Sequence, residues 1–257
     1  MPLTFAHPAA VLPFQRKNKY VHFSAMVFGS MAPDFEYFLN GQPVGNFGHT
    51  LTGFIFLNLP LVIAVYFIYK FFIRETLLYY LPFSLHESYI EKQDVSNMWK
   101  IIIFCYSALF GMLTHVVWDS FTHIDGFMVM KFPVFSYMFH LYDFTIPLYK
   151  FLQHGSTLFG ITALTIYVFY KNRLEENEVG SGVSGKQKII FWCILFFLAL
   201  IFLILWYLID YIPATNYGIA VVRIIDSVLV SLLVVSLLFK EKKRNISINS
   251  LYTKNDL

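Results

Sequence analysis

The stretch Gly111–Gly126, GMLTHVVWDSFTHIDG, closes an apolar run and carries His115, Asp119 and His123 at intervals of four residues. A helix turns by about 100° per residue, so the three side chains lie within roughly 80° of one helix face. A rise of about 1.5 Å per residue spreads them over roughly 12 Å. One metal ion could therefore bind an adjacent pair, whereas using all three requires two ions or a helix that unwinds near Thr122.

The composition excludes an ordinary soluble protein. Of the 257 residues, 57% are hydrophobic and 14% are charged, and the mean hydropathy is +0.59. These values indicate an integral membrane protein whose partner is the lipid bilayer. The net charge of +3 gives no reason to expect a nucleic-acid partner. Cys105 and Cys193 lie within apolar runs and predict neither a disulfide framework nor a thiolate metal site.

The apolar segments predict an all-α bundle of membrane-spanning helices. We expect about five transmembrane helices, at residues 53–73, 101–117, 156–170, 189–209 and 220–239. Five prolines break the first fifty residues into short interfacial or re-entrant helices, one of them at about residues 21–31. Residues 1–240 are expected to form one membrane-embedded domain, with residues 241–257 as a basic polar tail.

The basic residues predict the orientation of the chain. Lys240, Lys242, Lys243 and Arg244 follow the last predicted span, which favours a cytoplasmic C-terminus. Counting back through five spans places residues 1–50 and 118–154 on the outer face. Two spans separate these regions, so they share a face even if the orientation is reversed. Arg16, Lys17 and Lys19 would instead favour the cytoplasm for the first region. No basic region precedes the first apolar residues, so we expect no cleavable signal peptide and a mature chain that keeps His7.

The two regions on this shared face carry candidate metal ligands. Imidazoles and carboxylates suit zinc and other divalent first-row ions. The candidates are His7, Asp34 and His49 before the first span, and His115, Asp119 and His123 after the second. They are enough for two ions bridged by a carboxylate, an arrangement that hydrolyses phosphoesters. His154 is equally a ligand, a proton carrier or the polar cap of the third span.

Each candidate also has a structural interpretation. A lone buried His or Asp is commonly a hydrogen-bonded structural residue, and Asp34 could simply start a helix after Pro33. Three ionisable groups beside one span are nevertheless costly to desolvate without a partner. Glu36 and Asp143 are candidate general bases or residues that orient a ligand, with a solvated surface position as the alternative. Arg223 and Asp226 predict an ion pair within the last span or an interfacial position.

Several blocks of the chain resemble a family of uncharacterised bacterial membrane proteins that is catalogued as a domain of unknown function. The blocks are TFAHPAAVLP (4–13), GSMAPDFEYF (29–38), GHTLTG (48–53), THVVWDSFTHIDG (114–126) and QHGST (153–157). The resemblance covers roughly residues 1–240. More distantly, the chain is similar to membrane-bound metal-dependent hydrolases and to zinc-dependent phospholipase C-type proteins, in which His and Asp from several helices hold metal. The resemblance implies a bacterial inner (cytoplasmic) membrane and favours hydrolysis.

The leading hypothesis is therefore a membrane-bound metal-dependent hydrolase with zinc as the expected ion. Its substrate would be a phosphoester of a lipid or a lipid-linked molecule at the outer face of the membrane. The alternative is a non-catalytic structural or interaction protein with a buried His/Asp polar network. A transporter or haem carrier ranks third, because the ionisable candidates cluster at the ends of spans and not at their centres.

Overall fold

The computed structural model describes residues 3–14, 19–82, 96–141, 144–175, 183–213 and 215–252. These residues are mostly helical and belong to two compact units. Unit 1 comprises Met1–Glu36, Gly45–Tyr66 and Ser88–Lys171; unit 2 comprises Tyr37–Val44, Phe67–Glu87 and Asn172–Leu257. The expectation of one domain over residues 1–240 stays a prediction.

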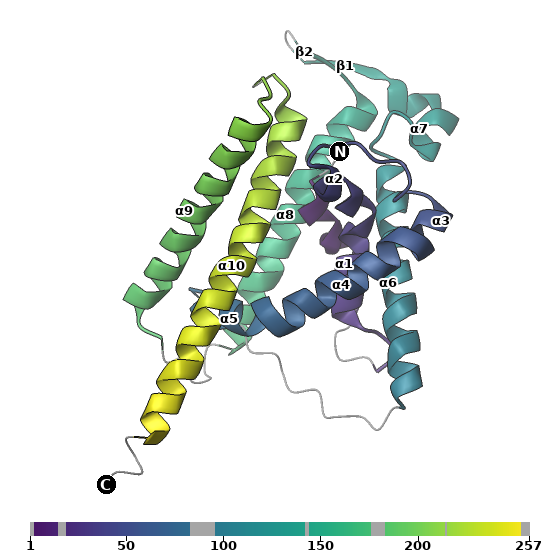
Figure 1. The fold of residues 1–257 in the computed structure, drawn as a ribbon. Helices are drawn as coiled ribbons and strands as arrows, with labels where there is room; N and C mark the ends of the chain where they lie inside the picture. Colours follow the sequence, from purple (N-terminus) through teal and green to yellow (C-terminus); the bar gives the residue numbers. More distant parts are fainter. Residues whose placement is uncertain are drawn as a thin grey trace. The chain divides into compact units, whose positions relative to one another are not determined.

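The elements follow one another along the chain as Figure 1 labels them. The first half of the chain contains η1 (Thr4–Val11), α1 (Phe23–Met31), η2 (Ala32–Asp34), α2 (Phe35–Asn40), α3 (Leu51–Gly53), η3 (Phe54–Asn58), α4 (Leu59–Ile68), η4 (Tyr69–Ile73), α5 (Arg74–Tyr80) and α6 (Asn97–Asp119). The second half contains α7 (Phe127–Lys131), η5 (Pro133–Ser136), β1 (Met138–Leu141), β2 (Phe144–Pro147), α8 (Leu148–Glu175), α9 (Gly185–Ile209) and α10 (Tyr217–Tyr252). The elements η3 and η4 are π-helical turns within a continuous helix.

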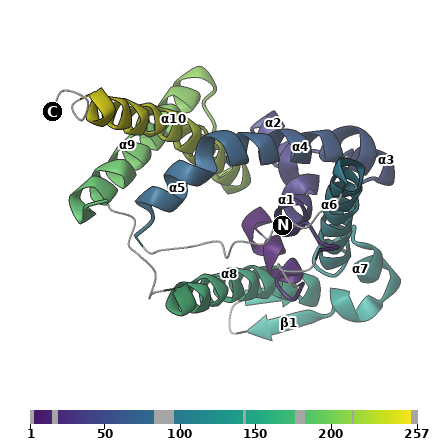
Figure 2. The ribbon, with the colours of Figure 1, turned by 90° about the horizontal axis from the view of Figure 1, so that it is seen from below.

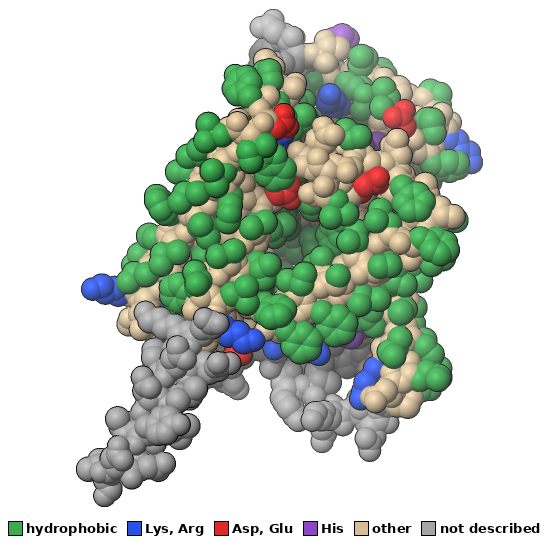
Figure 3. Space-filling view, viewed as in Figure 1, with side chains coloured by type: hydrophobic (Ala, Val, Ile, Leu, Met, Phe, Trp, Pro, Cys, Tyr) green, Lys and Arg blue, Asp and Glu red, His purple; other side chains and the backbone are tan. Residues whose placement is uncertain are grey.

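Four helical segments of the described residues are long and apolar enough to cross a membrane. They are Leu51–Tyr80, Asn97–Asp119, Gly185–Ile209 and Tyr217–Lys240. Apolar side chains also dominate the face drawn in Figure 3, where Lys, Arg, Asp and Glu are sparse. Exposed apolar surface on this scale is unusual for a soluble monomer and is compatible with an integral membrane protein.

The predicted count of five spans is not confirmed. Residues 156–170 lie within α8, which is 28 residues long but is less apolar than the four segments above. The first span was expected to end at residue 73, but helix α5 continues it over Arg74–Tyr80. Two hydrogen bonds within unit 2 hold α5: the Thr76 hydroxyl donates to the Ser236 carbonyl, and the Trp192 indole donates to the Tyr80 carbonyl. The antiparallel β1–β2 hairpin was not predicted. Helix α10 continues to Tyr252, beyond the predicted start of the polar tail.

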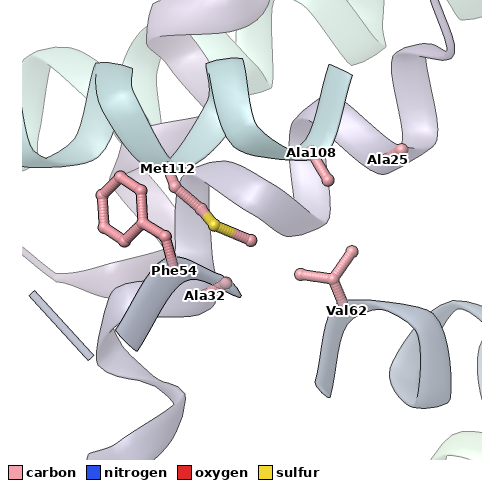
Figure 4. Packing of buried hydrophobic residues seen from close by; sticks show 6 residues of the cluster. All are labelled: Ala25, Ala32, Phe54, Val62, Ala108 and Met112. Carbon is pink, nitrogen blue, oxygen red and sulfur yellow. The ribbon is translucent and has the colours of Figure 1, made fainter. Parts of the chain in front are cut away.

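The core of unit 1 lies where α1 crosses α6. Small residues let the two helices approach closely: a Cβ at Gly29 would lie 2.2 Å from the Ala108 carbonyl oxygen, and one at Gly111 would lie 2.2 Å from that of Met26. Small residues at a helix crossing allow this backbone contact in membrane proteins. Figure 4 shows the buried side chains around it: Ala25, Ala32, Phe54, Val62, Ala108 and Met112. The crossing fixes α1 against the last turns of α6.

The N-terminal 3-10 helix η1 packs inside unit 1 against α1, α6 and α8. Figure 2 shows it between α1 and α8, and the Leu3 amide donates a hydrogen bond to the Thr157 hydroxyl of α8 at 3.1 Å. Pro8 lacks an amide hydrogen and disfavours a longer regular helix here. His7 is thereby held in the interior, with 1% of its surface exposed.

Unit 2 has its own core between α9 and α10. Phe191, Leu195 and Val235 are buried there, with Tyr80 stacked on Phe191. The predicted Arg223–Asp226 pair is replaced by another one, because the Arg223 guanidinium bonds Asp210 at the end of α9. The unit thus contains a charged pair that the sequence spacing did not indicate.

Candidate metal centre

Four side chains of unit 1 converge on one point. The four-residue cluster consists of Asp34, His49, His115 and Asp119, and one donor atom of each lies within 4.8 Å of the others. Its nearest donor pairs are 3.2–3.9 Å apart. An ion with four ligands at about 2.1 Å in tetrahedral geometry separates those ligands by about 3.4 Å. The cluster therefore has the dimensions of a metal coordination shell.

His115 is held in the tautomer that suits a ligand. Its Nδ1 lies 2.7 Å from the Ser30 carbonyl oxygen, which can only accept a hydrogen bond. Nδ1 therefore carries the hydrogen, and the opposite nitrogen, Nε2, points at the carboxylates of Asp34 (3.5 Å) and Asp119 (3.2 Å). Metal-ligating histidines typically make this carbonyl contact with their second nitrogen. The close α1–α6 crossing brings the Ser30 carbonyl to the ring.

Asp34 is oriented by a residue from the N-terminal helix. The Thr4 hydroxyl donates a hydrogen bond to one carboxylate oxygen, Oδ2, at 2.6 Å. The other oxygen, Oδ1, faces the histidines and has no hydrogen-bond partner among the described residues, although Asp34 is only 1% exposed. Asp34 does stand at a helix start, in η2 after Pro33, as the structural interpretation predicted. The structural interpretation of Asp34 is therefore confirmed, and its role as a metal ligand stays a prediction.

The loop that carries His49 is fixed from two sides. The Gly48 amide donates to the Glu36 carboxylate at 2.9 Å, and the Asn58 side-chain amide donates to the Gly48 carbonyl at 2.6 Å. Asn58 is fully buried at the end of the π-helical turn η3, and such turns often occur at functional sites. Glu36 thus holds the residue directly before His49, and its role in orienting a ligand stays a prediction.

Asp119 presents its two carboxylate oxygens to different neighbours. Oδ2 faces His115 and His49, whereas Oδ1 lies 3.6 Å from His7 Nε2 and 3.6 Å from His123 Nδ1. Helix α6 ends at Asp119, so His123 follows in a turn and not on a continued helix face. His123 Nδ1 also lies 3.2 Å from the Asp119 carbonyl, an obligate acceptor, so this nitrogen carries hydrogen. His115 and Asp119 therefore share one helix face as predicted, whereas His123 does not lie on a continuation of that helix.

His7 is buried against the cluster without belonging to the group of four. Its ring stacks on that of His115 with 3.8 Å between centroids, and neither ring nitrogen has a hydrogen-bond partner in the described part of the chain. Burial, with a smaller effect of His115, lowers the pKa of His7 to about 3 although Asp119 opposes this shift. The imidazole is thus neutral at physiological pH, the form in which histidine donates a lone pair.

Two further pKa shifts keep donors unprotonated. Burial, followed by His115, lowers the pKa of His49. Burial by itself would raise the pKa of Asp34, but the positive charge of a protonated His115 and its hydrogen bond outweigh burial, so the pKa lies below its ordinary value. An ion in place of that proton would act in the same direction. Both groups are consequently in the forms that bind a cation at neutral pH.

The remaining predicted residues lie elsewhere. His154 is exposed on α8 and is not among the four clustered residues. Asp143 lies outside the described residues. Three residues around the site were missed by the sequence reasoning, namely Thr4, Ser30 and Asn58. Thr4 and Ser30 fall within the quoted family-like blocks, but no local pattern marked them as contacts of the site. Asn58 could have been noticed, because it is a polar amide within an apolar span.

Comparison with known proteins was consistent with the sequence blocks. A family model described as "Domain of unknown function (DUF4184)" matches residues 1–237. The chain belongs to the DUF4184 family. All members of the four-residue cluster lie within the matched range. No curated protein and no solved structure matches this DUF4184 chain, so the distant similarity to metal-dependent hydrolases stays a prediction.

The hydrogen bond from Thr4 gives a test of how Asp34 is held. We expect Thr4→Val to weaken divalent-metal affinity by about 10–100-fold, the usual effect of removing a residue that orients a ligand. Thr4→Ser keeps the hydroxyl and should stay close to wild type. Metal affinity is measured by competition with a chromogenic chelator. Equal affinities for the two variants would contradict the orienting role of Thr4.

Proposed function

We propose that this DUF4184 protein is a membrane-bound metal-dependent hydrolase whose ion is held by Asp34, His49, His115 and Asp119. The observation that carries the proposal is the convergence of these four donors, from three separate parts of the chain, at the spacing of a coordination shell. We also propose a bacterial inner-membrane location with the site on the outer face. That orientation rests on Lys240, Lys242, Lys243 and Arg244, and a reporter fused to the C-terminus checks it.

The donor set requires a positive charge at its centre. His115 Nε2 lies 3.5 Å from the Asp34 carboxylate and 3.2 Å from the Asp119 carboxylate, and a neutral imidazole would present a lone pair to both. Burial of such an arrangement without a positive charge costs several kcal/mol. Two imidazoles and two carboxylates match the preferences of zinc and related first-row ions. We propose zinc as the resident ion on these grounds.

The proposed chemistry depends on the bound ion and on the route by which substrate and water reach it. A divalent ion lowers the pKa of a coordinated water from 15.7 to about 7 and neutralises charge on phosphoryl oxygens. His49 and His123 each expose about a quarter of their side chains, 25% and 28%, whereas His7 and His115 are almost fully buried. Substrate and water would therefore reach the cluster on the side of His49 and His123.

A phosphoester is the substrate class that we propose. The second carboxylate oxygen of Asp119, Oδ1, lies 3.6 Å from His7 Nε2. The Asp119 carboxylate could therefore bridge two ions, with one ion on each oxygen. Carboxylate-bridged pairs of ions are typical of phosphoester hydrolysis. The location next to the membrane-spanning helix α6 favours a lipid or lipid-linked ester over a soluble one.

The alternative is a non-catalytic membrane protein in which a proton occupies the place of the ion. A protonated His115 would donate a charge-assisted hydrogen bond from Nε2 to the carboxylates of Asp34 and Asp119. It would leave both nitrogens of His7, which is 1% exposed, without a hydrogen-bond partner among the described residues. A second ion between His7 and Asp119 Oδ1 would give His7 a partner, and this favours a metal centre that extends to His7. A haem sandwiched between His7 and His115 does not fit, because their rings already stack at 3.8 Å.

Turnover of phosphoesters tests the proposed activity directly. Zinc-loaded protein in lipid nanodiscs should release phosphate or headgroup from at least one member of a panel of phospholipids and alkyl phosphates. We expect Asp119→Asn to reduce kcat/KM by at least about 100-fold, since it removes a ligand charge on which the ion depends. Chelation should abolish turnover and zinc should restore it. Metal-loaded wild type that cleaves nothing in the panel would favour the non-catalytic alternative.

A further inference from the structure

Unit 1 contains an apolar groove beside the metal centre. Its volume is about 780 Å³, within the range of roughly 300–1,000 Å³ that is usual for small-molecule sites. Helices α6 and α8 supply its walls, and η1 contributes Ala10. The largest lining side chains are Phe110, Trp118, Phe121, Phe151 and Phe159. An apolar cavity of this kind suits a hydrocarbon and excludes a charged group.

The groove runs along a membrane-spanning helix. Its lining on α6 extends from Phe110 to Trp118, about 12 Å of helix at 1.5 Å per residue, and continues to Phe121 and Thr122 in the turn that follows. The residues His115 and Asp119 lie on the adjacent face of the same helix turns. The long axis of the groove therefore follows the direction of a lipid chain that lies beside α6 in a bilayer.

One end of the groove touches the metal centre. The Trp118 ring packs edge-on against His7, with 5.7 Å between ring centroids. The Thr122 hydroxyl, also in the groove lining, lies 3.3 Å from His123 Nδ1. Trp118 and Thr122 thus contact His7 and His123, the two histidines that each lie 3.6 Å from Asp119 Oδ1 at the edge of the cluster. A molecule with a long apolar chain and an anionic head could occupy the groove and the metal centre at once.

We infer that the groove binds the hydrocarbon chain of a phosphate-headed lipid whose head lies at the metal centre. This inference rests on the proposed function, because the metal supplies the charge that attracts the phosphate. Contact of the chain with the groove then contributes to affinity in proportion to its length. Each buried methylene is worth about a fourfold gain. A soluble phosphoester lacks this contribution and should be a poor ligand.

The test uses 3-bromododecyl phosphate, whose bromine lies close to the phosphate and hence at the Trp118 end of the groove, and zinc-loaded protein in nanodiscs of unbrominated phosphatidylcholine. Bromine quenches an indole that it contacts, so we expect saturable quenching that disappears in Trp118→Phe. Gly155 lines the groove, and a Cβ built on it has no neighbour within 4 Å. Gly155→Phe therefore fills the groove without a backbone clash and should weaken binding at least about tenfold. Thr165→Phe, at an exposed position further along α8, is the matched control and should bind as wild type does.

A second probe distinguishes the contribution of the phosphate head to binding from that of the hydrocarbon chain. Bromododecanol has the same chain without phosphate, and it should bind more weakly than bromododecyl phosphate only while zinc is present. Absence of saturable Trp118 quenching in the wild type, or full binding by Gly155→Phe, would overturn the groove inference. Failure of the proposed hydrolysis looks different: quenching and its loss in Gly155→Phe would persist while no phosphoester is turned over.

Discussion

Purified wild-type protein is expected to carry about one divalent ion per chain, and Asp119→Asn to carry less than about a tenth of that amount. The substitution preserves the shape of the side chain but removes the charge that Oδ2 presents to His115 and His49. Buried donor sets that lose a charged member rarely retain their ion, since the remaining ligands no longer offset its desolvation. Elemental analysis of protein that has passed size-exclusion chromatography measures the ratio.

Two other substitutions serve as controls for metal loss. Asp125→Asn changes an exposed carboxylate six residues after Asp119, and His154→Ala removes an exposed imidazole on α8. Both should keep the wild-type metal content. A wild type that is folded, monodisperse and metal-free after growth with excess zinc would refute the metal centre and leave the protonated His/Asp network as the explanation.

The second large effect is expected from Gly111→Val, at the crossing of α6 with α1. Its branched side chain would meet the Met26 carbonyl oxygen, which lies 2.2 Å from the position of the first added carbon. Overpacking against backbone costs about 2–3 kcal/mol. Separation of the helices would also withdraw the Ser30 carbonyl from His115. We therefore expect lower thermal stability together with loss of metal, measured by fluorescence-detected thermal unfolding and elemental analysis.

Gly185→Ala is the matched control for this variant. Gly185 lies in the first turn of α9 in unit 2, and a Cβ there has no neighbour within 4 Å. Alanine favours a helix over glycine, so the melting temperature should stay the same or rise slightly. If Gly111→Val melts as the wild type does and keeps its metal, the close crossing does not support the site.

The helical fold could be predicted because hydropathy and length report directly on membrane-spanning helices. Four predicted spans correspond to such helices in the structure, and the short helix at about residues 21–31 corresponds to α1. The ends of the helices were less accurate. Helix α5 extends the first span through Arg74 and Glu75, since unit 2 supplies hydrogen bonds to Thr76 and the Tyr80 carbonyl. Contacts of this kind leave no local trace in the sequence.

The donors of the cluster could be named from the sequence, but their arrangement could not. Spacing on α6 related His115 to Asp119, and an even number of intervening spans predicted that Asp34 and His49 would lie on the same side. The same spacing argument wrongly placed His123 on the helix face of His115 and Asp119. It assumed that the helix continues to His123, whereas α6 ends at Asp119. The hydrogen bonds from Thr4 and to the Ser30 carbonyl depend on tertiary packing.

The distribution of the donors along the chain has a consequence for biogenesis. Asp34 and His49 precede the helical segment Leu51–Tyr80, whereas His115 and Asp119 end the segment Asn97–Asp119. Both segments must therefore be inserted into the membrane before His115 and Asp119 can approach Asp34 and His49. We therefore expect the proposed ion to be captured late in maturation, from the compartment that the completed centre faces.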